Sequence, residues 1–152
     1  MADPRNARNN NPGNIRHSDS QWEGMAAEQN DPDFVTFISP EFGIRALVKT
    51  LITYQDTHGL STLREMVGRW APPNKLVDGE WVFENATEAY VQSVVATTGF
   101  DPDAPLDIRD KSTAAALAKG FTVQEGGRET FEAQFAPAVS AGVNLALGNQ
   151  EP

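Results

Sequence analysis

Cysteine is absent from this sequence of 152 residues, and histidine occurs only twice, as His17 and His58. Without cysteine the chain forms no disulfide, has no thiolate nucleophile and cannot build a Cys-containing zinc site. The two histidines lack the HExxH spacing of zinc peptidases, and the GxSxG motif of serine hydrolases is missing. We therefore expect no metal and no cofactor, and a chemistry that needs only a carboxylic acid, a hydroxyl or an amide.

Long apolar runs and a surplus of positive charge are also missing. No run approaches the roughly 18–20 residues that span a bilayer, so we expect no integral membrane segment. The first residues carry no apolar stretch of a secretory signal, and this bare start suggests a chain trimmed at its front. Because the formal net charge is -9, we expect no nucleic acid as a partner, since its phosphates would need a Lys/Arg surface.

The remaining composition is that of an ordinary globular domain. Hydrophobic residues make up 39% and charged residues 22% of the chain, and the length suits a single domain over residues 1–152. Residues 1–15 are rich in turn formers. We expect them to be an ordered loop or a flexible arm, with residues 1–8 as the flexible part.

Helical spacing of apolar residues dominates most of the chain. Ser39 and Pro40 predict a helix start, and that helix should stop at Gly59. Residues 34–38 predict a strand, and Asp78-Gly79 predicts the turn of a small hairpin. Further helices are expected from the Ser61 cap to residue 70, from the Asn85 cap to Gly99, from the Asp110 cap to Glu125, and after Pro137. The sequence thus predicts a mainly α (α+β) fold with a minor β-hairpin or small sheet.

Glu125 is the candidate catalytic acid. It ends an apolar helix, where the negative pole of the helix dipole and a hydrophobic flank both disfavour its charge and raise its pKa. A raised carboxyl pKa suits a general acid that protonates a glycosidic oxygen near neutral pH. The alternative is an exposed glutamate at a helix end with no such role.

Three segments resemble motifs of the lytic transglycosylases. Gln-Glu-Gly-Gly at residues 124–127 resembles the segment of their catalytic glutamate, residues 69–74 stand where they carry a Tyr-Asn loop, and residues 87–94 are similar to their Glu-Thr-x-x-Tyr-Val helix. By that resemblance Tyr90 contacts the catalytic glutamate, although it could equally be a core aromatic. The motifs occur in a different order here, which implies a circularly permuted lysozyme-like fold.

A wider match covers residues 8–16 (RNNNPGNIR), 21–24 (QWEG), 39–45 (SPEFGIR) and 70–73 (WAPP). This succession resembles the virion lytic proteins of cystoviruses, the enveloped double-stranded RNA phages. The resemblance implies a lysin held on the nucleocapsid beneath the envelope. Such a lysin acts in the host periplasm on the glycan strands of peptidoglycan, at the start of infection and at host lysis, and its partners include other virion proteins.

Four side chains are candidates for binding a sugar substrate. Asn11 and Asn14 offer amides for acetamido and hydroxyl groups, although Asn-rich turns are also plain turn chemistry. Trp22 could stack on a pyranose ring or belong to the core. Asn74 stands at the end of the loop-like motif. Glu23 and Glu41 are rival acids, but an exposed turn and a helix start explain them.

Glu125 is the one carboxylate to which the matched motifs assign a catalytic role, and this favours a particular reaction. Hydrolases that invert or retain configuration use two carboxylates, whereas a lytic transglycosylase manages with one. We therefore expect cleavage of the bond between N-acetylmuramic acid and N-acetylglucosamine with a 1,6-anhydro product. The alternatives are an endopeptidase of the peptide cross-links and a wall-binding virion module without catalysis.

Overall fold

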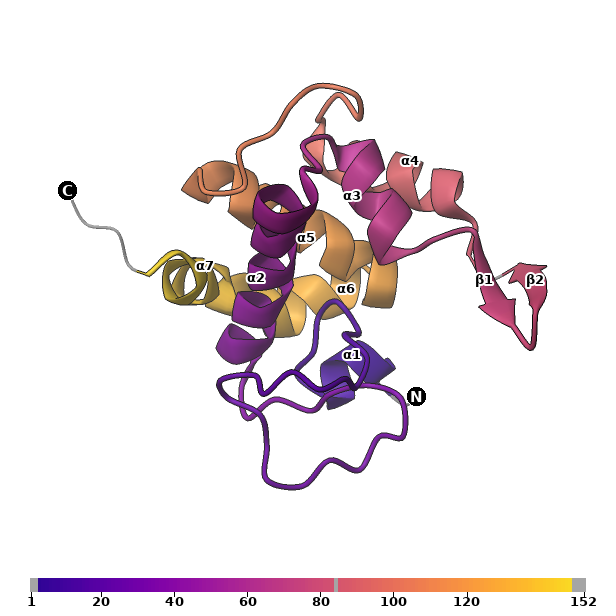
Figure 1. The fold of residues 1–152 in the computed structure, drawn as a ribbon. Coiled ribbons are helices and arrows are strands. Elements are labelled where there is room, and N and C mark those ends of the chain that lie inside the picture. The colour runs from indigo at the N-terminus through magenta and orange to yellow at the C-terminus, as the bar shows by residue number, and fades with distance from the viewer. Residues whose placement is uncertain (1–2, 84, 149–152) are drawn as a thin grey trace.

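The computed structural model describes residues 3–83 and 85–148, and helices dominate this part of the chain (Figure 1). The helices are α1 (Arg5–Arg8), α2 (Pro40–His58), α3 (Leu63–Trp70), α4 (Thr87–Thr98), α5 (Lys111–Gly126), α6 (Arg128–Thr130) and α7 (Val139–Leu147). A π-helical turn, η1 (Phe131–Phe135), and a 3-10 turn, η2 (Ala136–Ala138), connect α6 to α7. The strands β1 (Asn74–Val77) and β2 (Glu80–Phe83) form one antiparallel hairpin. The expected mainly α, α+β class is confirmed.

Helix α2 is the longest helix of the described residues, with 19 residues. Ser39 precedes it, Pro40 is its first residue, and Gly59 ends it with a φ of 68°, as the sequence predicts. Its buried face carries Ile44, Leu47, Val48 and Leu51. Helices α7 and α5 pack against it (Figure 1). No helix in the described residues is long and apolar enough to cross a membrane.

Helices α4 and α5 lie side by side and carry Tyr90 and Glu125, respectively. The Asp110 side chain caps α5 by accepting a hydrogen bond from the Thr113 backbone N–H at 3.0 Å, as predicted. A Cβ atom at Gly120 would lie 2.8 Å from Cγ1 of Val94, so the glycine lets the two helices approach closely. Helix α4 ends at Gly99, also as predicted.

The strand predicted over residues 34–38 is wrong. Val35 and Phe37 are buried and alternate with more exposed neighbours, but the segment makes only isolated bridges, Arg16 to Phe34 and Met25 to Phe37. Amide side chains take up backbone groups that a neighbouring strand would otherwise pair. Asn11 donates to the Val35 carbonyl, and the Gln29 side-chain oxygen accepts from the Thr36 N–H, both at 2.8 Å.

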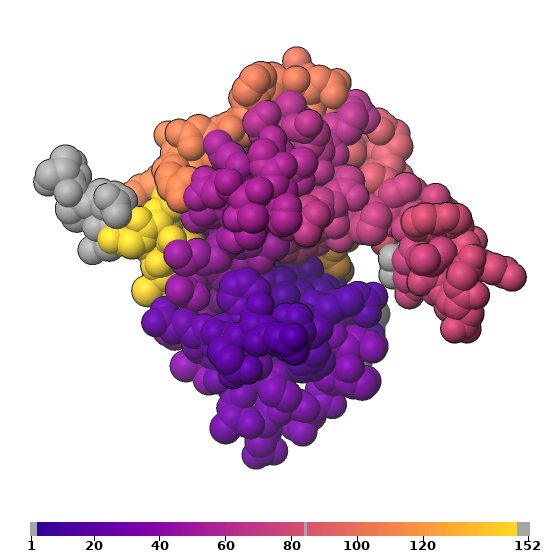
Figure 2. Space-filling view, in the orientation of Figure 1, coloured from indigo at the N-terminus to yellow at the C-terminus, as the bar shows by residue number. Residues whose placement is uncertain are grey.

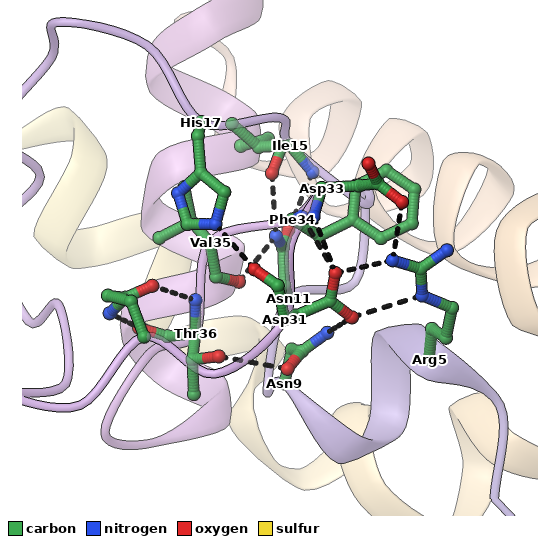
Figure 3. A network of polar contacts seen from close by, with 11 residues as sticks. Arg5, Asn9, Asn11, Ile15, His17, Asp31, Asp33, Phe34, Val35 and Thr36 are labelled. Carbon is green, nitrogen blue, oxygen red and sulfur yellow. Dashed lines mark hydrogen bonds and ion pairs between the residues drawn. The ribbon is translucent and has the colours of Figure 1, made fainter.

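The N-terminal loop is tied to the same segment through Asp31 (Figure 3). Its carboxylate accepts hydrogen bonds from the Arg5 guanidinium, from Asn9 Nδ2 at 3.0 Å and from the backbone of Phe34 at 3.0 Å. The Arg5 guanidinium is the main reason that the pKa of Asp31 lies far below its usual range. Residues 5–8 of the expected loop form the one-turn helix α1, which the sequence did not predict. Residues 1–2 of the expected flexible part lie outside the described residues.

Two predicted helix starts are shifted along the chain. Thr62, rather than Ser61, caps α3 in a reciprocal capping box with Glu65. Helix α4 begins after Ala86, because the side chain of Asn85 donates instead to the Pro72 carbonyl at 2.8 Å. That bond closes the base of the β1–β2 hairpin.

The hairpin itself is confirmed, with Asp78 and Gly79 at its turn. It projects from the helical body in both views (Figure 1 and Figure 2). Its large apolar side chains Leu76, Trp81 and Phe83 are exposed.

Candidate functional site

A cavity of about 450 Å³ opens where the N-terminal loop meets the helices. Its walls come from residues 13–16, from residues 70–72 at the end of α3, and from Tyr54, Tyr90 and Glu125 on α2, α4 and α5. Among the described residues that line it, Glu125 is the single acid and Arg16 the single cation. A concave site of this size, with few polar groups among aromatic walls, is typical of a small-ligand pocket.

Glu125 lies one residue before the end of α5, and both of its carboxylate oxygens are hydrogen-bonded. Oε1 accepts from Nδ2 of Asn14 and Oε2 accepts from the hydroxyl of Tyr90, each at 2.8 Å. Burial raises the pKa of Glu125. Side-chain hydrogen bonds from Asn14, Tyr90 and Trp70 and the positive charge of Arg16 lower it. Burial outweighs these contacts, so the carboxyl group holds its proton to higher pH than an exposed glutamate does.

Tyr90 is buried and lines the cavity, where its hydroxyl donates to Glu125. Its ring packs edge-on against Phe121 with centroids 5.6 Å apart. Burial, followed by the negative charge of Glu125, raises the pKa of the Tyr90 phenol well above its ordinary value. The phenol therefore stays protonated and donates to Glu125, which fixes the orientation of the carboxyl group.

Asn14 reaches Glu125 because the N-terminal loop is held in one shape. The backbone of Asn14 has a φ of 52°, in the left-handed region that asparagine tolerates better than most residues. Asn11 is fully buried, donates to the carbonyls of Ile15 and Val35, and accepts from the Ile15 N–H at 2.9 Å. Asn11 thus shapes the loop, while Asn14 faces the acid.

Two glycines let this loop approach the helices. A Cβ atom at Gly43 of α2 would lie 1.9 Å from the Asn10 carbonyl oxygen, and one at Gly126 would lie 2.1 Å from Oδ1 of Asn6. Any side chain at either position would push the loop away. The glycine that follows Glu125 therefore has a packing reason in this fold.

The structure brings together four of the six predicted site residues, since Glu125, Tyr90, Asn14 and Trp22 all line the cavity. Asn11 does not line it, because its polar atoms hold the loop, as described above. Asn74 does not line it either, because it is exposed at the start of β1.

The rival acids lie outside the cavity. Glu23 is exposed and pairs with Arg45 at 3.2 Å, and Glu41 is in the first turn of α2. No group of three His, Cys, Asp or Glu side chains in the described part of the chain could hold a metal ion.

Trp70, Tyr54 and Arg16 are among the cavity residues that sequence reasoning did not select. Trp70 stood at the end of a predicted helix, and the structure shows that it lines the cavity and packs edge-on against Phe121 and Tyr54, with ring centroids 4.9 Å and 6.3 Å apart. Tyr54 fitted the apolar face of α2, and Arg16 stood in a motif without an assigned role.

Fold and site together define a mainly helical α+β protein with an aromatic-walled cavity, in which Glu125 is the one acid among the lining residues that the structure describes. No protein-family profile matches the chain. Protein P5 of Pseudoalteromonas phage PM2 is 34% identical to it over 125 residues, which are 80% of this chain and 71% of the relative. The chain belongs to the family of this phage protein, whose name states no activity.

Proposed function

We propose that this protein degrades peptidoglycan, with Glu125 as the acid that cleaves the glycan strand. The observation that carries the proposal is the environment of Glu125, a partly buried carboxyl group with a raised pKa, held on both oxygens inside a cavity. Such a group is still protonated when exposed carboxyls have ionised. General acid catalysis of glycosidic cleavage requires that state.

The proposed reaction is that of a lytic transglycosylase and needs one acid/base. Glu125 donates its proton to the glycosidic oxygen, and the bond from that oxygen to C1 of N-acetylmuramic acid breaks. The C6 hydroxyl of the same sugar then forms a bond to C1 and gives its proton to the Glu125 carboxylate. The 1,6-anhydro product forms and the acid is regenerated. The absence of a second carboxylate among the described cavity-lining residues favours this route over hydrolysis with two acids.

Tyr90 and Asn14 act on Glu125 in this proposal. Their hydrogen bonds stabilise the carboxylate that exists between the two proton transfers, and they keep it pointed into the cavity. Trp22 and Trp70 supply aromatic surface that suits the apolar faces of pyranose rings.

The proposed fold is lysozyme-like and circularly permuted, with the acid-bearing helix α5 after the other two motifs. The phage origin of the relative supports a role in the virion. We propose a nucleocapsid lysin of the cystoviral kind, which opens the wall in the host periplasm during infection and lysis.

Mass spectrometry of peptidoglycan digested with the purified protein tests the reaction. We expect muropeptides with 1,6-anhydro ends. New reducing ends in their place would show hydrolysis by a muramidase. New amino groups without new sugar ends would show an endopeptidase and would overturn the proposal.

A further inference from the structure

Arg16 is the one cation among the described residues that line the cavity, and the structure fixes its place there. Its backbone bridges to Phe34, which also lines the cavity. Its guanidinium carbon lies 5.2 Å from the centroid of the Phe34 ring, a cation–π contact. The guanidinium is thus held at the cavity wall, while the residue as a whole remains exposed.

Arg16 makes no salt bridge within the described residues, whereas four other arginines of this acidic chain do. The chain has 21 Asp and Glu residues against 12 Lys and Arg. Salt bridges to carboxylates are made by Arg5, Arg45, Arg64 and Arg109. Within residues 3–83 and 85–148, no carboxylate lies within salt-bridge distance of Arg16. In so acidic a protein, an arginine that faces a cavity without a carboxylate partner is available to an anionic ligand.

We propose that Arg16 binds a carboxylate of the ligand in this cavity, so that the site selects an anionic glycan over a neutral one. This inference rests on the proposed function and deepens it. The planar guanidinium fork matches a carboxylate with two parallel hydrogen bonds. Peptidoglycan offers such groups from two sources: the lactyl ether of N-acetylmuramic acid on strands without peptides, and the stem peptides. A polymer of N-acetylglucosamine alone offers none.

Arg16 also acts on Glu125, because its charge lowers the pKa of that acid. This effect changes the cleavage of every substrate by a similar factor. Recognition of a carboxylate changes only the cleavage of substrates that carry one. The ratio of kcat/KM between a charged and a neutral substrate therefore isolates recognition.

The test uses three glycan hexamers that share the same cleavable bond. The first has alternating sugars with free lactyl carboxylates, the second is the same hexamer with those carboxylates capped as neutral N-methylamides, and the third carries stem peptides. The values of kcat/KM are measured for the wild type, Arg16→Gln and Arg16→Lys. Arg8→Gln is the matched control, because Arg8 is exposed, donates to the Asp3 carbonyl and lies outside the cavity.

We expect the wild type and Arg8→Gln to prefer a carboxylate-bearing hexamer over the capped one by about 10-fold or more. In Arg16→Gln that preference should disappear, and Arg16→Lys should keep part of it, since lysine retains the charge without the fork. Preference for the first hexamer identifies the lactyl group, and preference for the third alone identifies the peptide.

Two results overturn the inference while the proposed function stands: a wild type that cleaves all three hexamers equally well, and an Arg16→Gln variant that loses the same factor on all three. A wild type that cleaves none of them overturns the proposed function as well.

Discussion

Asn14 donates a hydrogen bond of 2.8 Å to Glu125, a residue 111 positions further along the chain. This contact joins the N-terminal loop to the end of α5. The position of the candidate acid therefore depends on segments far apart in the sequence. The loop reaches α5 only because Gly43 and Gly126 leave room for it. A change in the loop conformation should therefore change the pKa of Glu125, because the Asn14 hydrogen bond lowers it.

Replacement of Tyr90 by Phe should raise the pKa of Glu125, because it removes a hydrogen bond that favours the carboxylate. The alkaline limb of the pH–activity profile should move to higher pH, and an NMR titration of the Glu125 carboxyl carbon should show the same direction. Tyr54→Phe is the matched control, because it removes a hydroxyl from the same cavity that is not hydrogen-bonded to Glu125 in the described structure. Equal shifts in both variants would contradict the assigned role of Tyr90.

Glu125→Gln should gain stability relative to the wild type as the pH rises. The folded-state pKa of Glu125 is raised above its ordinary value of 4.5, so its contribution to stability is complete below that pH and is lost as the pH rises through the folded pKa. Glutamine cannot ionise and escapes this loss. Urea unfolding of both proteins at pH 4 and pH 8, followed by circular dichroism, measures the difference. A difference in stability that does not change with pH would show that Glu125 is not destabilised by its burial.

Gly43→Ala should destabilise the fold by about 3 kcal/mol, because its Cβ would overlap the Asn10 carbonyl. Gly68→Ala in α3 is the control with the opposite expected sign, because a Cβ atom there would meet no neighbouring atom within 4 Å. It should stabilise the protein by roughly 0.5–1 kcal/mol through helix propensity. Thermal unfolding of the two variants should therefore move in opposite directions. The loop packing would be misassigned if Gly43→Ala proved neutral.

Asp31→Asn should weaken the fold at neutral pH but not in strong acid. The pKa of Asp31 is far below its ordinary value of 3.8, so its contribution to stability is complete above that pH and is lost as the pH falls through the folded pKa. The gap between wild type and variant should be largest at pH 7 and should shrink below about pH 4. Urea midpoints over this range measure it. A gap that stays constant into acid would assign the effect to geometry rather than to charge.

Local signals in the sequence predicted the elements whose ends depend on one or two residues. Ser39-Pro40, Gly59, Gly99 and Asp110 mark their helix ends, and Asp78-Gly79 marks the hairpin turn, because capping and turn chemistry act over a few residues. Residues 34–38 looked like a strand by the same kind of reasoning. Their backbone groups pair partly with amide side chains and partly with scattered loop backbone such as Ile15, Asn9 and Gly24, which no periodicity reveals.

The residues of the candidate site were harder to predict from the sequence than the helix ends. Glu125 could be chosen from its place at the end of an apolar helix, and Tyr90 from a motif. Asn11 and Asn14 are identical residues three positions apart, and only the path of the loop decides that one is buried in it and the other faces the acid. Arg16 lies at the cavity because its backbone bridges to Phe34. This contact joins two loops, and no sequence pattern indicates it.

Clearing of purified Gram-negative peptidoglycan by the wild type, Glu125→Gln and Glu23→Gln tests the central claim most directly, with the folding of each checked by circular dichroism. Glu23 is the matched control, since it is an exposed acid outside the cavity. We predict that folded Glu125→Gln clears the suspension at least ~10²-fold more slowly than the wild type, while Glu23→Gln clears it at the normal rate. A folded Glu125→Gln protein that clears peptidoglycan as fast as the wild type would contradict the role of Glu125 as the acid.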